Sequence, residues 1–358
     1  MTRLAICNTY SQLIITLRLI ETLWQGDQVD LVLSDHSIGT REACENLRGL
    51  GIFRNVYWRA TKEMCAPRSG VVSTVAKVRA FCFGVEDREI TENDYDEVSF
   101  FNVNTYLRGV YSKLSDRRRL SCSMFEEGVL SYAQSDFPNK LGLKLCDAIR
   151  DFMGKRHLEE DTKLFYCFYP EFYRGALTPV AIPRISRDSA VGEVLLRVFG
   201  ITKDMFDIKE KYIFFTSVYD FEGGDPIGEF GVVKQCADLL GRDNLIVKTH
   251  PRDTRTVYAD NGLHVYRNST IPWEAIQIFA DYSDKVFLTA SSGSVLSGNA
   301  MSGSPAKTFY MHKLCNLESN PSAQKTLATL ENLLNNAQMQ KTFKDFHIAE
   351  KIEDILCE

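Results

Sequence analysis

Three stretches of the sequence combine charged or hydroxyl side chains with a glycine or a proline directly after an apolar run. They are the carboxylate pair at 126–127, the cationic stretch at 248–253 and the serine-rich stretch at 289–301. The apolar runs before them are typical of short buried strands, so each stretch is expected where a strand ends. Ligands of open α/β sheets bind at such positions. These stretches are therefore the first candidates for chemistry.

The cationic stretch suits a phosphate group. His250 precedes Pro251, which ends the strand and should hold the imidazole rigidly, and Lys248 and Arg252 flank the pair. From this position the imidazole can give a hydrogen bond or a proton to a departing phosphoryl oxygen. A single histidine is more often a structural residue, so the two flanking cations carry the interpretation.

The serine-rich stretch opens a predicted helix. Ser291 and Ser292 precede its first turn, where free backbone N–H groups, hydroxyls and the positive end of the helix dipole favour an anion. Serine is also an ordinary helix N-cap. Helix capping alone is therefore the alternative to phosphate binding.

The carboxylate pair gains a role if a phosphate leaves from the other stretches, because an attacking hydroxyl then needs a base. Glu126 and Glu127 repel each other, which raises the pKa of one of them if it is partly buried. Neighbouring strand residues point to opposite sides, so we expect one glutamate to face the ligand. We assign Glu127, because Gly128 beside it allows a turn with positive φ. A solvated loop is the alternative.

Polar residues of the N-terminal half give a candidate site for a second substrate. Thr9 and Gln12 follow the first predicted strand, and Asn104 lies in the stretch after a later one. Their amides and hydroxyls suit a neutral sugar. Structural capping is an equal alternative for Thr9.

The elements that must position these residues alternate between strand and helix patterns. Strands are predicted at 3–7, 29–34, 55–60, 95–103, 120–125 and 163–170, with helices between them. The segment 171–189 contains two prolines and no clear period, which indicates a crossing between domains. A second alternating series begins with the apolar runs 193–201 and 211–217 and continues with strands at 244–250, 284–290 and 306–311. Two parallel α/β domains facing a cleft are expected, at 1–185 and 186–358.

Composition excludes several classes of protein. A length of 358 residues favours about two domains, and a net charge of −5 argues against a nucleic-acid binder. The ten cysteines form no CxxC pair and most lie in apolar stretches, which is typical of free thiols in a reducing cytoplasm. No signal peptide or membrane-spanning run is found. We expect a cytoplasmic protein that is soluble or at most peripheral on the membrane.

Taken together and in this order, the acidic-acidic-Gly, His-Pro and Ser-rich motifs resemble those of the bacterial sialyltransferases. The opening "LAICNTYSQLIIT" is similar to that of glycosyltransferase family 52. The resemblance implies a GT-B fold, no cofactor, and metal-independent, inverting transfer of sialic acid from CMP-sialic acid to a sugar hydroxyl. It implies a nucleotide-sugar donor and a glycan acceptor, such as a terminal galactose of a capsule or lipopolysaccharide. It is compatible with a homodimer and with a place on the cytoplasmic face of the inner membrane.

Residue by residue, the resemblance places the base at Glu126 or Glu127 and the general acid or phosphate donor at His250. It places phosphate contacts on Ser291 and Ser292 and a nucleotide contact on Lys248. Glu274 resembles a glutamate that binds ribose hydroxyls, although an acidic residue also favours a helix N-terminus by itself.

Some family 52 members place the base after the first strand of the second domain. Asp220 and Glu222 in this chain therefore compete with the carboxylate pair. Two further readings remain open. One keeps the fold with a UDP-hexose, CMP-Kdo or CDP-polyol donor, and the other is a non-catalytic sugar-nucleotide-binding scaffold.

Overall fold

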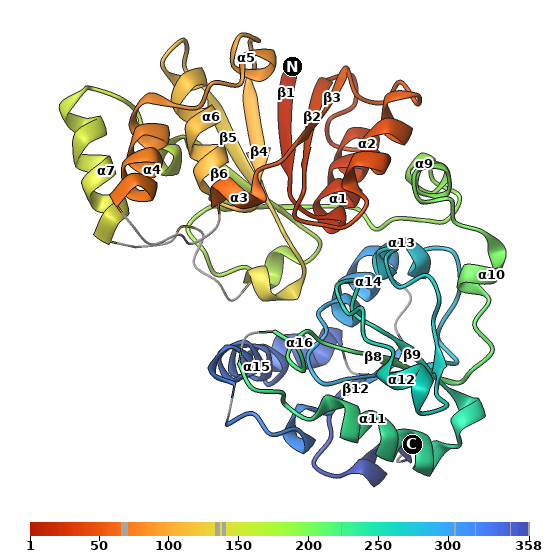
Figure 1. Cartoon of the computed structure of the whole chain (residues 1–358). Coiled ribbons are helices and arrows are strands. Elements are labelled where there is room, and N and C mark those ends of the chain that lie inside the picture. The colour runs from red at the N-terminus through yellow and green to blue at the C-terminus, as the bar shows by residue number, and fades with distance from the viewer. Residues whose placement is uncertain are drawn as a thin grey trace. The chain divides into compact units, whose positions relative to one another are not determined.

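The structure, a computed structural model, describes residues 1–65, 71–132, 137, 141–222, 224–303, 306–318, 320–343 and 345–356. The chain forms two compact units. The first comprises residues 1–127 and 134–183, and the second comprises residues 128–133 and 184–358 (Figure 1). Each unit contains its own parallel sheet, as the alternating pattern predicts.

The sheet of the first unit has seven strands in the order β3-β2-β1-β4-β5-β6-β7, all paired in parallel. Its strands are β1 (Thr2–Cys7), β2 (Gln28–Ser34), β3 (Asn55–Arg59), β4 (Glu97–Phe100), β5 (Ser121–Phe125), β6 (Thr162–Cys167) and β7 (Thr178–Ala181). The strand order reverses between β1 and β4, so the crevice where open sheets bind ligands lies at the carboxyl ends of these two strands.

Helices cover both faces of this sheet, which explains why its strands are nearly continuous apolar runs (Figure 1). They are α1 (Tyr10–Glu21), α2 (Thr40–Arg48), α3 (Lys62–Cys65), α4 (Val71–Phe83), α5 (Arg88–Thr91), α6 (Thr105–Ser115), α7 (Leu141–Phe152) and α8 (Leu158–Asp161), with short 3-10 turns η1 (Val129–Tyr132) and η2 (Pro170–Phe172). The turn η1 belongs to the second unit by its contacts.

The sheet of the second unit has six parallel strands in the order β10-β9-β8-β11-β12-β13. These strands are β8 (Tyr212–Phe215), β9 (Leu245–Lys248), β10 (His264–Val265), β11 (Val286–Thr289), β12 (Lys307–Tyr310) and β13 (Phe346–Ile348). The order reverses between β8 and β11, so the same rule points to the ends of these two strands.

The helices of this unit complete its alternating series. They are α9 (Ala190–Phe199), α10 (Lys203–Phe206), α11 (Glu229–Leu240), α12 (Val257–Asp260), α13 (Trp273–Gln277), α14 (Ser294–Ser302), α15 (Pro321–Leu334) and α16 (Ala337–Thr342), with 3-10 turns η3 (Arg242–Asn244), η4 (His312–Leu314) and η5 (Ile352–Leu356). One core cluster packs α11, including the buried Val233 and Cys236, against the sheet strands. Within the described ranges, no helix is long and apolar enough to cross a membrane.

The structure adds elements that the sequence pattern misses. The segment 171–189 is predicted to be irregular, but β7 lies within it and pairs with β6 at the edge of the sheet. Pro179 belongs to β7, and an edge strand tolerates proline because one side of it makes no ladder hydrogen bonds. The short strands β10 and β13 also have no counterpart in the predicted series.

Candidate active site

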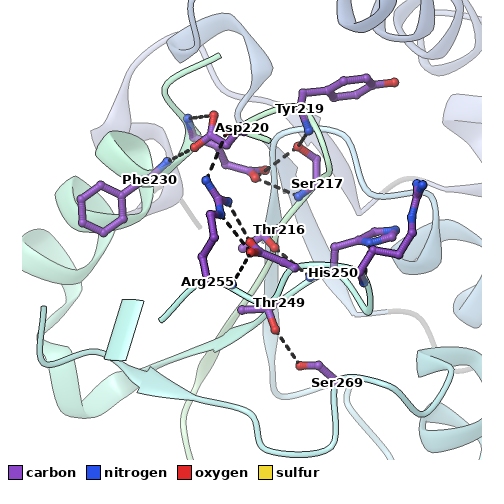
Figure 2. A network of polar contacts seen from close by, with 12 residues as sticks. Thr216, Ser217, Tyr219, Asp220, Phe230, Thr249, His250, Arg255 and Ser269 are labelled. Carbon is purple, nitrogen blue, oxygen red and sulfur yellow. Dashed lines mark hydrogen bonds and ion pairs between the residues drawn. The ribbon is translucent and has the colours of Figure 1, made fainter. Parts of the chain in front are cut away.

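The His-Pro pair follows β9 in the second unit and is fixed by backbone hydrogen bonds. The His250 amide donates to Oγ1 of Thr216 at 2.9 Å, and the His250 carbonyl accepts from the Asp253 amide at 2.8 Å. Figure 2 shows His250 and Thr216 joined in this network. The imidazole is therefore held at the carboxyl end of β9, beside the loop that follows β8.

A further contact determines where the imidazole carries its proton. The Arg252 amide donates to Nδ1 of His250 at 3.2 Å, and an amide can only donate, so Nδ1 is the acceptor. In the neutral ring the proton then resides on Nε2. Burial, with help from the charges of Arg252 and Lys248, lowers the pKa of His250 to about 4. At neutral pH the side chain is thus an uncharged N–H donor.

Lys248 is the cation beside this donor. Its side chain is buried, and Nζ donates a hydrogen bond to the carbonyl oxygen of Ser269 at 3.4 Å. Burial lowers the pKa of Lys248 to about 8, and the charge of Glu274 opposes that shift. Glu274 lies in the first turn of α13 and accepts from Oγ of Ser297 at 2.6 Å. The predicted nucleotide residues Lys248 and Glu274 therefore interact electrostatically in the free protein.

The serine-rich turn after β11 is organised around Thr289. Its Oγ1 donates to the carbonyl of Phe215 at 2.8 Å and accepts from the amides of Ser291 (3.2 Å) and Ser292 (2.8 Å). The amides that the sequence predicts to be free at these two serines are thus already bonded. The amides of Ser294 and Val295, in the first turn of α14, make no hydrogen bond to a described residue. An anion at this end of α14 can use them together with the serine hydroxyls.

A cavity of about 480 Å³ adjoins the His-Pro pair. Its wall includes Thr249, His250, Pro251, Tyr266, Arg267 and Ser269. A hydrogen bond from Oγ1 of Thr249 to Oγ of Ser269 (3.1 Å) ties together two segments of this wall. The cavity is of the size that small ligands occupy.

Asp220 and Glu222, the alternative bases, have partners in the free protein. Both carboxylate oxygens of Asp220 accept backbone amides at the start of α11, from Glu229 (3.1 Å) and Phe230 (3.0 Å), as Figure 2 shows. Glu222 forms an ion pair with Arg252 at 2.7 Å. Asp220 is therefore placed as a helix cap, and the pair of Glu222 with Arg252 links the loop after β8 to the His-Pro turn.

Glu229 is a buried acid that the sequence did not single out. It has no exposed surface, and its Oε2 accepts from the amide (2.8 Å) and the hydroxyl (3.1 Å) of Ser217. Burial raises the pKa of Glu229 to about 8. An acidic first helical residue usually reflects only the helix dipole, so no sequence signal distinguished it.

In the first unit, the two adjacent glutamates point to different partners. Glu126 is completely buried, and its Oε2 accepts from the Phe168 amide at 2.9 Å. Glu127 is half-buried and lies 3.5 Å from Nδ2 of Asn102, measured from its Oε2. Gly128 has φ of 70°, the positive value that the turn was expected to need.

The three predicted acceptor residues all have structural partners. Thr9 caps α1 by accepting from the Gln12 amide at 3.4 Å, and Asn104 caps α6 by accepting from the Leu107 amide at 2.9 Å. Gln12 is fully buried and donates from Nε2 to Oδ1 of Asn102 at 2.8 Å. Their role in acceptor binding stays a prediction.

Two amides from the predicted acceptor-side stretches, other than the three assigned residues, occupy the point where the first sheet reverses its order. Asn8 follows β1 and Asn102 follows β4, and Nδ2 of Asn8 donates to Oδ1 of Asn102 at 3.1 Å. Asn102 could have been distinguished from Asn104 in the sequence. It lies at the carboxyl end of the predicted strand 95–103, whereas Asn104 follows that strand and precedes a helical pattern, as an N-cap does.

No group of three or more histidine, cysteine or acidic side chains suited to a metal ion occurs among the described residues. The described cysteines are all free thiols.

Comparison with known proteins gives a likeness in structure only. No family model and no curated protein sequence matches the chain. The chain is similar to an alpha/beta-galactoside alpha-2,3-sialyltransferase from Photobacterium phosphoreum, with a TM-score of 0.54 and 11% identity over 99% of this chain and 98% of that chain. It is also similar to Arabidopsis thaliana UGT89C1 complexed with UDP, with a TM-score of 0.49 and 13% identity over 96% and 92% of the two chains. The two parallel-sheet units and the first of these likenesses show that the chain has the GT-B fold.

Proposed function

We propose that this protein is an inverting glycosyltransferase that moves sialic acid from CMP-sialic acid to a sugar hydroxyl of a bacterial surface glycan. The observation that carries the proposal is the His-Pro turn, where an uncharged imidazole with its proton on Nε2 lies beside the buried cation Lys248. The resemblance of the motifs to family 52 and the fold shared with a sialyltransferase support the same reading.

The donor is held by the second unit in this proposal. Lys248 and Nε2 of His250 face the phosphate of CMP, and the hydroxyls of Ser291 and Ser292 add to the anion site at the start of α14. The nucleoside extends over Pro251 into the adjoining cavity, and Glu274 binds the ribose hydroxyls. Arg252 is already paired with Glu222, so it contributes to the phosphate through its charge.

The reaction is a direct displacement. Glu127 takes the proton of the acceptor hydroxyl, whose oxygen forms a bond to the anomeric carbon. The bond between that carbon and the phosphate oxygen breaks, and its electron pair leaves with CMP. Nε2 of His250 donates a hydrogen bond to the leaving phosphate, and Lys248 stabilises its charge. One displacement inverts the anomeric configuration and forms no covalent glycosyl-enzyme.

The acceptor and the location follow from the same proposal. The described neighbour acts on a galactoside, so a terminal galactose is the acceptor we propose. The enzyme would work in the cytoplasm, where a lipid-linked acceptor would bring it to the inner membrane surface. A homodimer is compatible with this reaction.

A donor screen by thermal shift tests the function. Only a ligand that binds the native state stabilises it, by about 3 kcal/mol at a hundred times Kd. We expect CMP and CMP-sialic acid to raise Tm and UDP-hexoses to leave it unchanged. CMP-Kdo and CDP-polyols share the cytidine monophosphate group, so we expect them to be distinguished by the absence of transfer to a galactoside. Transfer to a galactoside should then proceed in EDTA, because Lys248 and His250 supply the charge stabilisation. Stabilisation by UDP-sugars alone would assign another donor, and binding without turnover would favour the scaffold.

A further inference from the structure

A chain of hydrogen bonds crosses the first unit at the carboxyl ends of β2, β1, β4 and β5. It begins at His36, whose Nδ1 lies 2.9 Å from Oγ of Ser34, and continues from that hydroxyl to Oδ1 of Asn8 at 2.7 Å. Asn8 then donates to Asn102 at 3.1 Å. Asn102 lies within 3.5 Å of Glu127. Residues from four neighbouring strand ends are thereby connected.

The bonds of this chain all point the same way. The Ser34 hydroxyl has one proton and gives it to Asn8, so Nδ1 of His36 must be the donor to Ser34. Nδ2 of Asn8 then donates to Asn102, and each donor polarises the next. Each donor of the chain therefore points toward Glu127, so the aligned dipoles present their positive ends to its carboxylate.

The orientation of the Asn102 amide is fixed by two donors. Nδ2 of Asn8 (3.1 Å) and Nε2 of Gln12 (2.8 Å) both bind Oδ1 of Asn102, so this atom is the oxygen. The NH₂ group must therefore face Oε2 of Glu127. Gln12 is itself held, because its Oε1 accepts from the Asn8 amide at 2.7 Å. Turning the Asn102 amide over would break its two bonds to Asn8 and Gln12 and would also lose the donor that faces Glu127.

We propose that Asn102 is a positioning residue that holds the Glu127 carboxylate in the orientation in which it takes the acceptor's proton. This inference rests on the proposed role of Glu127 as the base. The distance of 3.5 Å is long for a hydrogen bond, and such contacts shorten when substrate binds. Among the described residues of the first unit, the titratable groups near Glu127 include Glu126, which is buried against the Phe168 amide, and the neutral Cys7 thiol, whose pKa burial raises to about 12.

Asn102→Asp is the sharpest test. An aspartate keeps an oxygen for Asn8 and Gln12 to bind, but it cannot donate to Glu127 and adds a second carboxylate beside it. A hydrogen bond to a carboxylate favours its charged form and a like charge disfavours it, so both changes raise the pKa of Glu127. With CMP-sialic acid and a galactoside, the acid limb of kcat/KM should move upward by about one pH unit, a loss that approaches about tenfold below both pKa values and disappears well above them. CMP binding, measured by thermal shift, should stay unchanged.

The matched control is Asn93→Asp. Asn93 is an amide on the same unit that lies before β4, and its Nδ2 donates to the carbonyl of Glu89. This variant adds the same charge at the opposite end of the strand and should leave the pH profile as in the wild type. Asn102→Ala should shift the acid limb in the same direction but less, because it removes the donor without adding charge.

A second measurement does not depend on turnover. Carbon-13 NMR of protein labelled at glutamate follows the Glu127 carboxyl, and Glu127→Gln identifies its resonance. In Asn102→Asp the titration midpoint of Glu127 should rise above that of the wild type. An unchanged midpoint, or a loss of kcat/KM that is equal at all pH values, overturns the inference even if Glu127→Gln is inactive. Full activity of Glu127→Gln overturns the base assignment, and the positioning role falls with it.

Discussion

The two units place their site residues at the same topological position but build it from different chemistry. In each sheet the strand order reverses once, between β1 and β4 and between β8 and β11. At the first reversal, Asn8 bonds directly to Asn102 across the gap. At the second, Thr289 reaches the carbonyl of Phe215 and gathers the amides of the serine-rich turn.

The groups around these two positions differ in how they carry charge. The first unit offers neutral amides and one half-buried carboxylate, Glu127, which suits proton transfer from a neutral hydroxyl. In the second unit Lys248 is buried and His250 is half-buried, and loss of solvation lowers the pKa of each. Burial removes water from the Lys248 ammonium, and an anionic ligand would compensate for this loss. In the function that we propose, the base therefore comes from the first sheet and the phosphate site from the second.

The largest effect is expected when the carboxylate of the first unit is neutralised. Glu127→Gln keeps the shape and the contact with Asn102 but cannot accept a proton. We expect kcat to fall by about 10²–10⁴-fold, the usual contribution of a general base. The affinity for CMP should persist, because the proposed donor site lies in the second unit. Transfer assays and thermal shift measure the two quantities separately.

Glu126→Gln is the matched control for this prediction. The glutamine can still accept from the Phe168 amide, so kcat should change little. Reversed effects of the two variants would move the base to Glu126. Mild effects of both would return the role to Glu222 or Asp220, and Asp220 would first have to release the amides at the start of α11.

His250→Ala tests the leaving-group side. Removing the Nε2 donor should lower kcat by about 10²–10³-fold, as loss of one preorganised donor does elsewhere. His250→Gln retains an N–H donor and should recover part of this loss. Because the pKa of His250 is about 4 in the free protein, the wild-type rate should show no limb near pH 6.5 from this residue. Equal activity of the Ala and Gln variants would mean that the hydrogen bond contributes nothing.

Lys248 should make donor binding depend on pH. Its pKa of about 8 means that the ammonium form dominates at pH 7 and is lost as the pH rises above 8. An anionic donor prefers the charged form, so the Kd for CMP should rise by about tenfold between pH 7 and pH 9. Lys248→Met should bind weakly, with a Kd that no longer varies over this range. A parallel slope in the variant would assign the pH dependence to another group.

The sequence predicted much of the fold because its signals are local. The strands predicted at 3–7, 29–34 and 244–250 correspond to β1, β2 and β9, because parallel strands covered on both faces are apolar runs. The edge strand β7 was missed because Pro179 normally argues against a strand. The positive φ of Gly128 was predicted from its place after two acids at a strand end.

The site was harder to predict where it depends on contacts between distant residues. The bond from Asn8 to Asn102 joins positions 94 residues apart in the chain, and no local pattern announces it. The burial of Glu229 likewise depends on Ser217, in the loop before its helix. Local signals identified Lys248, His250 and Glu127 as residues at strand ends. They could not show which groups from distant parts of the chain form hydrogen bonds with these side chains.

The smallest expected effect distinguishes a cap from a ligand contact. Asn104 caps α6 through its Oδ1, and Leu107 donates the amide. Replacing an asparagine N-cap by alanine costs about 1 kcal/mol of stability, because one helix amide loses its partner. Asn104→Ala should therefore lower Tm by about 2–4 °C and leave the KM for the acceptor unchanged. Asn104→Ser retains a capping oxygen and should restore most of the stability. A raised acceptor KM in both variants, at unchanged Tm, would instead make Asn104 part of the acceptor site. Asn104 would then join Asn8 and Asn102 as a third amide at the carboxyl ends of the first sheet.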